Sequence, residues 1–249
     1  MIIIKSQPEI DKIAAACRIV AEILESLKSY VKVGMTTADV EAYAEKRIRQ
    51  RKAIPAFKGY RGYPASACTS VNDQVVHGIP SRLVKLKSGD VISVDLGVIL
   101  DGFYGDGAIT IPVGDVDAGA QRLMQVTEES LYAGIKSAVV GNRVSDISNA
   151  VQRHVEAQGF SVVRAFVGHG IGHSLHEDPQ VPNFGKPGQG QRLKHGMTLA
   201  IEPMVNAGTP DVEILEDGWT AVTADGKLSA HFEHTIAVTK NGPVILTKI

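Results

Sequence analysis

Two acidic residues occupy the same place in two similar stretches of the sequence. The stretch LKSGDVISVDLGV contains Asp95, and the stretch LKHGMTLAIEPMV contains Glu202, each at the tenth position. The two acids are 107 residues apart, since 202 − 95 = 107. A second pair follows in DGAI and EHTI, where Asp106 corresponds to Glu233 at an offset of 233 − 106 = 127. All four acids lie in apolar, strand-like surroundings, where a charged carboxylate is unfavourable unless it has a partner or a function.

A hairpin would bring the first two acids together. If its turn is centred on Asp101-Gly102, then Asp95 faces residue 108 and Asp106 faces residue 97. Residues 95 and 97 share a face, so the two acids are diagonal neighbours on one side of the sheet. The repeat predicts the same diagonal relation for Glu202 and Glu233.

Four buried carboxylates repel one another unless cations lie between them. The repulsion and the loss of hydration cost several kcal/mol per ion, so the acids would take up protons or bind metal. Oxygen-rich clusters bind divalent ions, and two ions sharing bridging carboxylates are the natural arrangement. The alternative is that each acid flanks a turn or lies at an exposed edge, as a single acid in a strand usually does. The repeated register favours the metal site.

Histidines supply candidate ligands of another kind. His169 lies in VGHGIGH, where the flanking glycines leave room for a metal or substrate. Its counterpart in the first half would be Gly62, because 169 − 107 = 62, which predicts two unequal metal positions. The glycine spacing also resembles a dinucleotide loop, although no helical pattern follows. His77 and His176 lie in loop-like stretches, where a histidine is more often a surface residue.

The remaining pattern predicts an α+β domain. The chain has 249 residues, 44% hydrophobic and 21% charged, with a net charge of −1, which does not indicate nucleic acid or a charged membrane surface as a partner. Two cysteines form no disulfide framework, and no apolar run approaches a membrane span. We therefore expect a soluble, cytoplasmic protein. Helical spacing is expected near residues 10–27, after Thr36 or Thr37, and near 118–139 and 145–158.

Each half of the chain then has the order helix, helix, strand, strand. The halves run over roughly 5–112 and 113–240, within a single catalytic domain spanning 1–249. Two such halves would place their antiparallel strands side by side in the centre, with the helices outside. The stretch FSVVRAFVGHGIGH is expected to be one strand that enters a glycine-rich turn.

Five short motifs carry a resemblance to a known family. VDLG, GDGAIT, GHGIG, IEPM and FEHT, in this order and spacing, resemble the type I methionine aminopeptidases, which share the pita-bread fold with aminopeptidase P, prolidase and creatinase. The likeness covers essentially the whole chain. NDQVVHGIP and GHGIGHSLHEDPQVPNFG resemble the methionine enzymes in particular. The resemblance implies a hydrolase that removes the N-terminal methionine of nascent polypeptides when the second residue is small.

The resemblance also implies roles for the metal ligands. Asp95 would bind one divalent ion, His169 and Glu202 the other, and Asp106 and Glu233 would bridge them. A water or hydroxide between the ions would attack the first peptide carbonyl. The ions are expected to be Co, Mn, Fe or Zn.

Further roles implied by the resemblance concern catalysis and substrate binding. Glu202 would act as general base and acid, His77 would contact the scissile amide, and His176 the developing oxyanion. The methionine pocket would be lined by Tyr60, Tyr63, Cys68, Leu175 and Trp219.

The resemblance leaves a few further expectations and departures. A monovalent cation, Na or K, is expected near Asn72 and Ser229. Ribosome contact follows from the substrate class, and the protein is expected to be a monomer. Gly97, Tyr104 and Leu175 depart from residues that many family members carry, which affects metal affinity and pocket shape.

Two alternative functions stay open at this point. One is a proline-directed aminopeptidase or prolidase-like hydrolase. The other is a catalytically silent binding module on the same fold, against which the complete ligand set argues.

Overall fold

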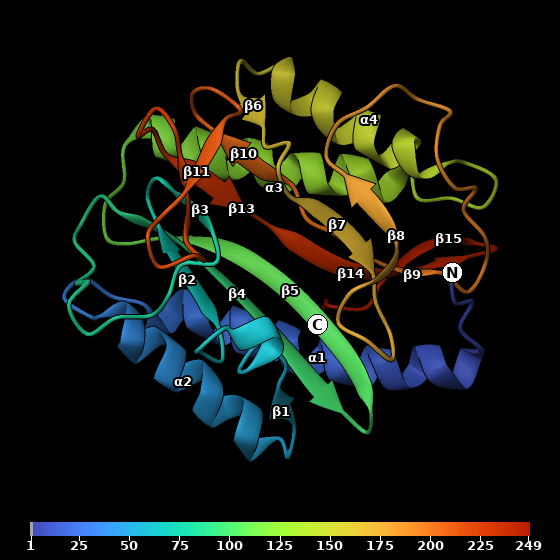
Figure 1. Ribbon diagram of the computed structural model, residues 1–249, viewed down its shortest axis with the longest axis horizontal. Coiled ribbons are helices and arrows are strands. Elements are labelled where there is room, and N and C mark those ends of the chain that lie inside the picture. Colours follow the sequence, from blue (N-terminus) through green and yellow to red (C-terminus); the bar gives the residue numbers. More distant parts are fainter. Residues whose placement is uncertain (1) are drawn as a thin grey trace.

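The computed structural model describes residues 2–249 and arranges their helices in two pairs (Figure 1). The helices are α1 (Gln7–Tyr30), α2 (Thr37–Gln50), α3 (Ala118–Lys136) and α4 (Val144–Glu156), with one 3-10 turn at Tyr60–Gly62. At the start of α1, the backbone N–H and the hydroxyl of Ser6 both donate hydrogen bonds to the Glu9 carboxylate, as in a capping box. Thr36 caps α2, because its hydroxyl accepts from the Asp39 N–H at 3.2 Å.

A nine-stranded sheet runs through the centre of the molecule. Its order is β1-β4-β5-β14-β9-β7-β8, with β2 paired to β4 and β15 to β14, and every pairing is antiparallel. The strands are β1 (Ile54–Pro55), β2 (Cys68–Val71), β4 (Val91–Leu100), β5 (Phe103–Pro112), β7 (Val167–Gly170), β8 (Glu177–Pro182), β9 (Thr198–Ile201), β14 (Glu233–Thr239) and β15 (Gly242–Ile245).

Two small sheets of three strands each complete the β structure. One contains β6 (Ser161–Val162), β10 (Met204–Asn206) and β13 (Ser229–His231), and the other contains β3 (Gln74–Val76), β11 (Val212–Ile214) and β12 (Ala221–Thr223). The expected single strand in FSVVRAFVGHGIGH is therefore wrong. Its first half forms β6 in a small sheet and its second half forms β7 in the large one, because β6 pairs with β10 and β7 with β9.

The expected hairpin is confirmed residue by residue. Asp101 and Gly102 both have positive φ angles, 49° and 79°, as a tight two-residue turn requires. Strand β4 pairs with β5 so that Asp95 faces Ala108 and Gly97 faces Asp106. The two carboxylates are thus diagonal neighbours on one face of the sheet.

The two halves of the sheet meet at a short seam between β5 and β14. Only two residue pairs join these strands, Glu233 with Ala108 and His234 with Gly107. Because Ala108 also faces Asp95, the residues Asp95, Ala108 and Glu233 form one row across three strands. The small alanine between two acids leaves open space above the sheet.

The second pair of acids has a different register from the first. Strand β14 pairs with β9 so that His234 faces Ile201, which brings the next residue, Glu202, level with Glu233. The expected diagonal relation is therefore wrong for this pair. Strand β9 ends at Ile201, just before Pro203, whose missing N–H cannot extend the ladder.

The helices pack on the face of the sheet opposite the acids, and in Figure 1 α1 and α3 pass behind the strands. A side chain on Gly105 would lie 2.5 Å from the backbone nitrogen of Cys17 in α1, and one on Gly107 would lie 3.1 Å from Val20. These odd-numbered residues of β5 face the helices, so Asp106 and Ala108 face the other side. The α+β architecture with a central sheet and outer helices is confirmed.

Candidate active site

A cavity of about 300 Å³ opens on the acid-bearing face of the sheet. We name it the acidic cavity. It brings together the five predicted metal ligands, the two predicted catalytic histidines and the predicted methionine pocket. Its lining residues are Phe57, Tyr60, Arg61, Tyr63, Cys68, His77, Asp95, Asp106, Phe166, His169, Leu175, His176, Glu202, Trp219 and Glu233.

The predicted ligands converge on the ring of His169. Its Nε2 lies 3.8 Å from Asp106 Oδ2 and 3.5 Å from Glu202 Oε1. Ligand atoms of Asp106, His169 and Glu233 all lie within 4.8 Å of one another. These separations suit groups that share a cation rather than groups that bond directly to one another.

Burial changes the protonation of this cluster when no cation is present. It raises the pKa values of Asp95, Glu202 and Glu233 well above their usual range, and neighbouring carboxylates raise them further. It also raises the pKa of Asp106 to about 7, opposed by the N–H of Gly107, which donates to its carboxylate. The cluster therefore binds protons unless other positive charge is supplied.

Two buried carboxylate oxygens in the cluster lack hydrogen-bond partners. Oδ1 of Asp95 and Oε1 of Glu233 are out of contact with solvent and accept no hydrogen bond from residues 2–249. An unsatisfied buried acceptor costs about 1–3 kcal/mol, so these atoms need a ligand. Four carboxylates and one imidazole form a donor set that fits hard or intermediate divalent ions.

The His169 ring is oriented by its own backbone neighbourhood. Its Nδ1 lies 2.9 Å from the carbonyl oxygen of Gly170, to which it donates when Nδ1 carries the proton. This contact leaves Nε2 free to ligate. Burial also lowers the pKa of His169 to about 4, which favours the neutral ring that a metal requires.

A further histidine lies behind the cluster. Nε2 of His231 is 3.9 Å from Glu202 Oε2, is buried, and has no hydrogen-bond partner among the described residues. Its backbone is tied to Thr110, whose hydroxyl donates to the His231 carbonyl at 2.8 Å. No local sequence pattern predicts that His231 lies near Glu202, because the long-range pairing of β10 with β13 brings it there.

The two predicted catalytic histidines flank the cluster. Nδ1 of His176 lies 2.7 Å from the hydroxyl of Tyr60, and its ring centre lies 4.3 Å from that of His169. His77 has a positive φ of 62° and meets Phe166 edge to face. Burial is the main cause that lowers the pKa of both histidines, for His176 to about 3.

An apolar wall borders the same cavity. Tyr63, Cys68 and Leu175 belong to one buried cluster, against which Tyr60 and Trp219 pack. The Tyr63 ring meets Trp219 edge to face at 5.1 Å, and the Tyr63 hydroxyl donates to the Gly78 carbonyl at 2.9 Å. All five predicted pocket residues therefore lie together beside the acids.

Sequence reasoning missed three residues that line the cavity: Phe57, Arg61 and Phe166. For Phe57 a signal was present in Gly97, which departs from the residue that many family members carry. A side chain on Gly97 would lie 2.7 Å from the Phe57 ring, so the glycine makes room for the phenylalanine. For Arg61 and Phe166 we found no local signal in the sequence.

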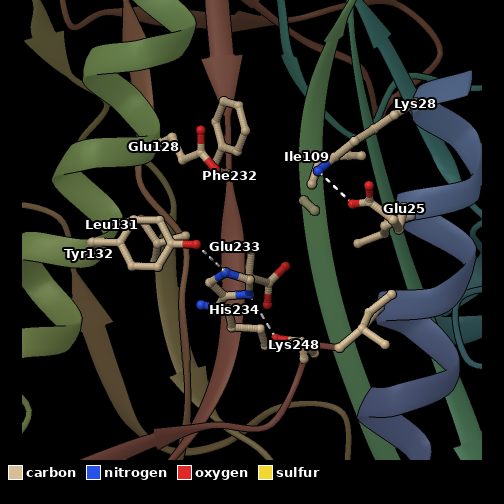
Figure 2. Close-up of a pocket in the computed structure, with 15 residues that line it drawn as sticks. Glu25, Lys28, Ile109, Glu128, Leu131, Tyr132, Phe232, Glu233, His234 and Lys248 are labelled. Carbon is tan, nitrogen blue, oxygen red and sulfur yellow. Dashed lines mark hydrogen bonds and ion pairs between the residues drawn. The ribbon is translucent and has the colours of Figure 1, made fainter.

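A second pocket of about 360 Å³ lies on the helix-covered side of the same seam (Figure 2). We name it the seam pocket. Figure 2 shows Tyr132 from α3 and the pair Glu25 and Lys28 from α1 on opposite sides of His234. Nδ1 of His234 bonds to the Thr247 hydroxyl at 2.9 Å, and its Nε2 lies 3.4 Å from the Tyr132 hydroxyl.

Comparison with known proteins assigns the class of this fold and site. The sequence profile of metallopeptidase family M24 matches residues 11–240. The chain therefore belongs to metallopeptidase family M24. Members of this family are metal-dependent hydrolases, in agreement with the oxygen-rich cluster described above.

The relatives narrow the assignment within the family. A methionine aminopeptidase of Clostridium perfringens is 55% identical over 249 residues, which is all of both chains. The crystal structure of a methionine aminopeptidase from Thermotoga maritima matches all of both chains with a TM-score of 0.98 and 48% identity. Within family M24, the chain thus groups with the methionine aminopeptidases.

A more distant structure confirms the expected pita-bread fold. The prolidase of Pyrococcus horikoshii OT3 matches 99% of this chain and 63% of its own, with a TM-score of 0.80 and 24% identity. Its likeness concerns the fold alone. In residues 2–249, none of the helices has the length and apolar character needed to cross a membrane.

Proposed function

We propose that the protein removes the N-terminal methionine from polypeptides whose second residue is small, with two divalent ions bound in the acidic cavity. One observation carries the proposal. Buried carboxylates with unpaired oxygens adjoin an apolar, aromatic wall in a single cavity of about 300 Å³. A metallohydrolase acting on a short apolar residue needs both parts side by side.

The two ions are assigned to the five converging side chains. Asp95 would hold one ion and His169 with Glu202 the other, while Asp106 and Glu233 bridge them. The row formed by Asp95, Ala108 and Glu233 supports one ion position between the carboxylates of Asp95 and Glu233. The contacts of His169 with Asp106 and Glu202 support a second, neighbouring position. Mn²⁺, Fe²⁺, Co²⁺ and Zn²⁺ all suit this donor set.

Bound divalent ions supply Lewis acidity, which polarises the peptide carbonyl and lowers the pKa of a water molecule. The protein's own groups then move the protons. Glu202, which lines the cavity, receives the proton of the attacking water on a carboxylate oxygen and passes it to the leaving nitrogen. The free α-amine of the substrate would bind beside the ion that Asp95 would hold.

The histidines act on the amide that is cleaved. His176 donates from Nε2 to the oxygen that gains negative charge, while Tyr60 holds its Nδ1. His77 contacts the scissile amide, and its ring is oriented by edge-to-face contacts with Phe166 and Trp219. Both roles need only short movements, because both rings already line the cavity.

The apolar wall selects the side chain of the first residue. Cys68 and Leu175 are buried, and the rings of Tyr63 and Trp219 line the same cavity, so the wall is able to contact a thioether. Phe57 occupies space that Gly97 leaves open and narrows the same wall. A flexible, unbranched methionine side chain fits such a pocket better than a branched one.

The wider context of the proposal rests on the substrate class. The whole chain acts as a single catalytic domain, since residues from both 5–112 and 113–240 line one cavity. The substrates are new polypeptides, so the setting is cytoplasmic and near the ribosome, and the enzyme works as a monomer. A Na or K ion near Asn72 and Ser229 would stabilise the two chain segments that meet there, where the Ser229 N–H donates to the Asn72 carbonyl at 2.9 Å.

The proposal is tested by comparing peptides and measuring metal. The purified protein, loaded with Mn²⁺ or Co²⁺, should release methionine from Met-Ala-Ser and leave Xaa-Pro peptides intact, and metal analysis should give two ions per chain. Preference for Xaa-Pro peptides would assign the prolidase-like activity instead. A metal-loaded sample that cleaves no peptide would identify a silent binding module.

A further inference from the structure

The segment that precedes α1 contains a lysine that is almost completely buried. The Lys5 side chain is 1% exposed, and its ammonium group forms an ion pair with Glu177, whose side chain is 6% exposed. The same nitrogen donates to the carbonyl of Ile3 at 3.1 Å. A charged pair is costly to bury, so this arrangement points to a specific task for Lys5 rather than to general surface stability.

Glu177 connects this pair to the turn that carries two active-site residues. Its Oε1 accepts the N–H of His173 at 2.8 Å and the N–H of Ser174 at 3.2 Å, while its other oxygen binds Lys5. The next two residues of this turn are Leu175 and His176, which line the acidic cavity. One carboxylate therefore fixes both the start of the turn and the buried lysine.

Gly172 shows that the lysine and the turn are packed together tightly. A side chain at this glycine would collide with Cε of Lys5 and would lie 3.0 Å from Oε1 of Glu177. The Gly172 carbonyl accepts the N–H of Tyr104 in β5 at 2.9 Å. The turn is thus held between β5 on one side and the segment before α1 on the other.

The lysine is itself anchored to the strand region of the second half. Its backbone N–H donates to the carbonyl of Gly196 at 2.8 Å, just before β9. Because β9 leads directly to Glu202, the segment around Lys5 joins the turn of His176 to the strand that presents the proposed general base. Lys5 itself is absent from the lining of the acidic cavity.

We propose that Lys5 is a positioning residue, which acts through Glu177 to hold the turn 172–176 so that His176 and Leu175 face the substrate. The inference rests on the proposed function, because it concerns the groups that bind and turn over the peptide. It assigns a kinetic role to a residue outside the cavity. The expected signature is a fall in kcat through His176 together with a rise in KM through Leu175.

The central experiment replaces Lys5→Met, which keeps the length of the side chain and removes its charge. With Met-Ala-Ser as substrate, kcat should fall between about tenfold and 100-fold, as expected for misplacement of a transition-state group by about 1 Å. Metal content should stay unchanged, because none of the five ligands is touched. Glu177→Gln, which keeps size and one acceptor oxygen, should act in the same direction if Lys5→Met folds poorly.

A double-mutant cycle separates positioning from simple loss of stability. In a His176→Ala background, Lys5→Met should lower kcat further by less than about threefold, since its target is already gone. Lys32→Met serves as the matched control, because Lys32 is exposed and the same change there should leave kcat and KM unaltered.

Three outcomes decide the question. A full kcat in folded, metal-loaded Lys5→Met would overturn the inference while the proposed function stands. An equal fall in kcat with and without His176 would also overturn it, and would identify a purely structural lysine. Failure of the unmodified protein to cleave Met-Ala-Ser would instead overturn the proposed function, which keeps the two failures distinct.

Discussion

The acidic cavity and the seam pocket lie on opposite faces of the same strand pair and differ in how their charges are arranged. Their volumes are similar, about 300 and 360 Å³, and Glu233 borders both. In the acidic cavity, Asp106 and Glu233 are buried and Asp95 and Glu202 are mostly buried, and in residues 2–249 no lysine or arginine forms an ion pair with these four carboxylates. Volume alone therefore does not separate the two pockets.

Several polar groups of the seam pocket have ordinary partners. Lys28 pairs with Glu25 at 2.7 Å, and the two side chains are 54% and 58% exposed. His234 bonds to Thr247, so its buried ring is satisfied. Polar groups that already have partners bind an additional ion only weakly. Unpaired buried charge, rather than a larger cavity volume, therefore marks the proposed catalytic face of this sheet.

The largest expected difference between the two faces comes from replacing two adjacent residues of β14, one on each face, by glutamine. Glu233→Gln should lower kcat by more than about 1000-fold, because losing the proposed bridging carboxylate would remove several kcal/mol of transition-state stabilisation. His234→Gln faces the helices and should keep kcat within about threefold. Steady-state kinetics and metal analysis of both variants provide the measurement. Equal losses in the two variants would contradict the assignment of faces.

Removing the metal should reveal the cost of the unpaired acids as a dependence on pH. Burial raises the pKa values of these acids, for Asp106 to about 7. A group whose pKa is higher in the folded state stabilises it fully below the unfolded value near 4, and this contribution is lost as pH rises through the folded value. The metal-free protein should therefore become less stable between pH 6 and pH 8.

Bound metal should counter this loss, because it replaces the protons that the acids otherwise hold. The gap in Tm between metal-loaded and metal-free protein should widen by at least about 4 °C over this pH range, given about 2–4 °C per kcal/mol for a chain of this size. Thermal unfolding at both pH values with and without chelator measures it. A constant gap would mean that the acids are not coupled in the way their burial indicates.

Much of the catalytic face was predictable because it depends on local pattern. The turn at Asp101-Gly102 fixes the register of its hairpin, and alternation along two strands then places Asp95 and Asp106 on one face. The motifs of the family added His169 and the apolar wall. Each of these steps needs information from only a few neighbouring residues or from a motif.

The rest depends on long-range pairing that no local pattern encodes. The seam between β5 and β14 joins segments more than 100 residues apart and puts Ala108 between two acids. The end of β9 before Pro203 sets Glu202 level with Glu233 rather than diagonal to it. Similarly, Lys5 looks like a surface residue in sequence, and only the folded chain buries it against Glu177.

Two tyrosines, one on each face, allow a smaller comparison of the pockets. Tyr60→Phe removes the hydroxyl that lies 2.7 Å from Nδ1 of His176 and should lower kcat by about three- to tenfold, the equivalent of roughly 1 kcal/mol. Tyr132→Phe removes a hydroxyl that lies 3.4 Å from His234 and should leave kcat unchanged. Measuring kcat for both with Met-Ala-Ser tests the pair. A fall in kcat only for Tyr132→Phe would reverse the roles given to the two pockets.

The smallest expected effect concerns the charges of the seam pocket. Lys28→Gln breaks the pair with Glu25, but both side chains are more than half exposed, and solvent screens their attraction. The free energy of unfolding should therefore fall by less than about 0.5 kcal/mol, and kcat and KM should not change. Urea unfolding of the metal-loaded protein and its variant measures the first quantity. A loss above about 1 kcal/mol, or a change in kcat or KM, would contradict this expectation. The paired, exposed charges of the seam pocket would then contribute to stability or catalysis as the buried acids on the other face of the sheet do.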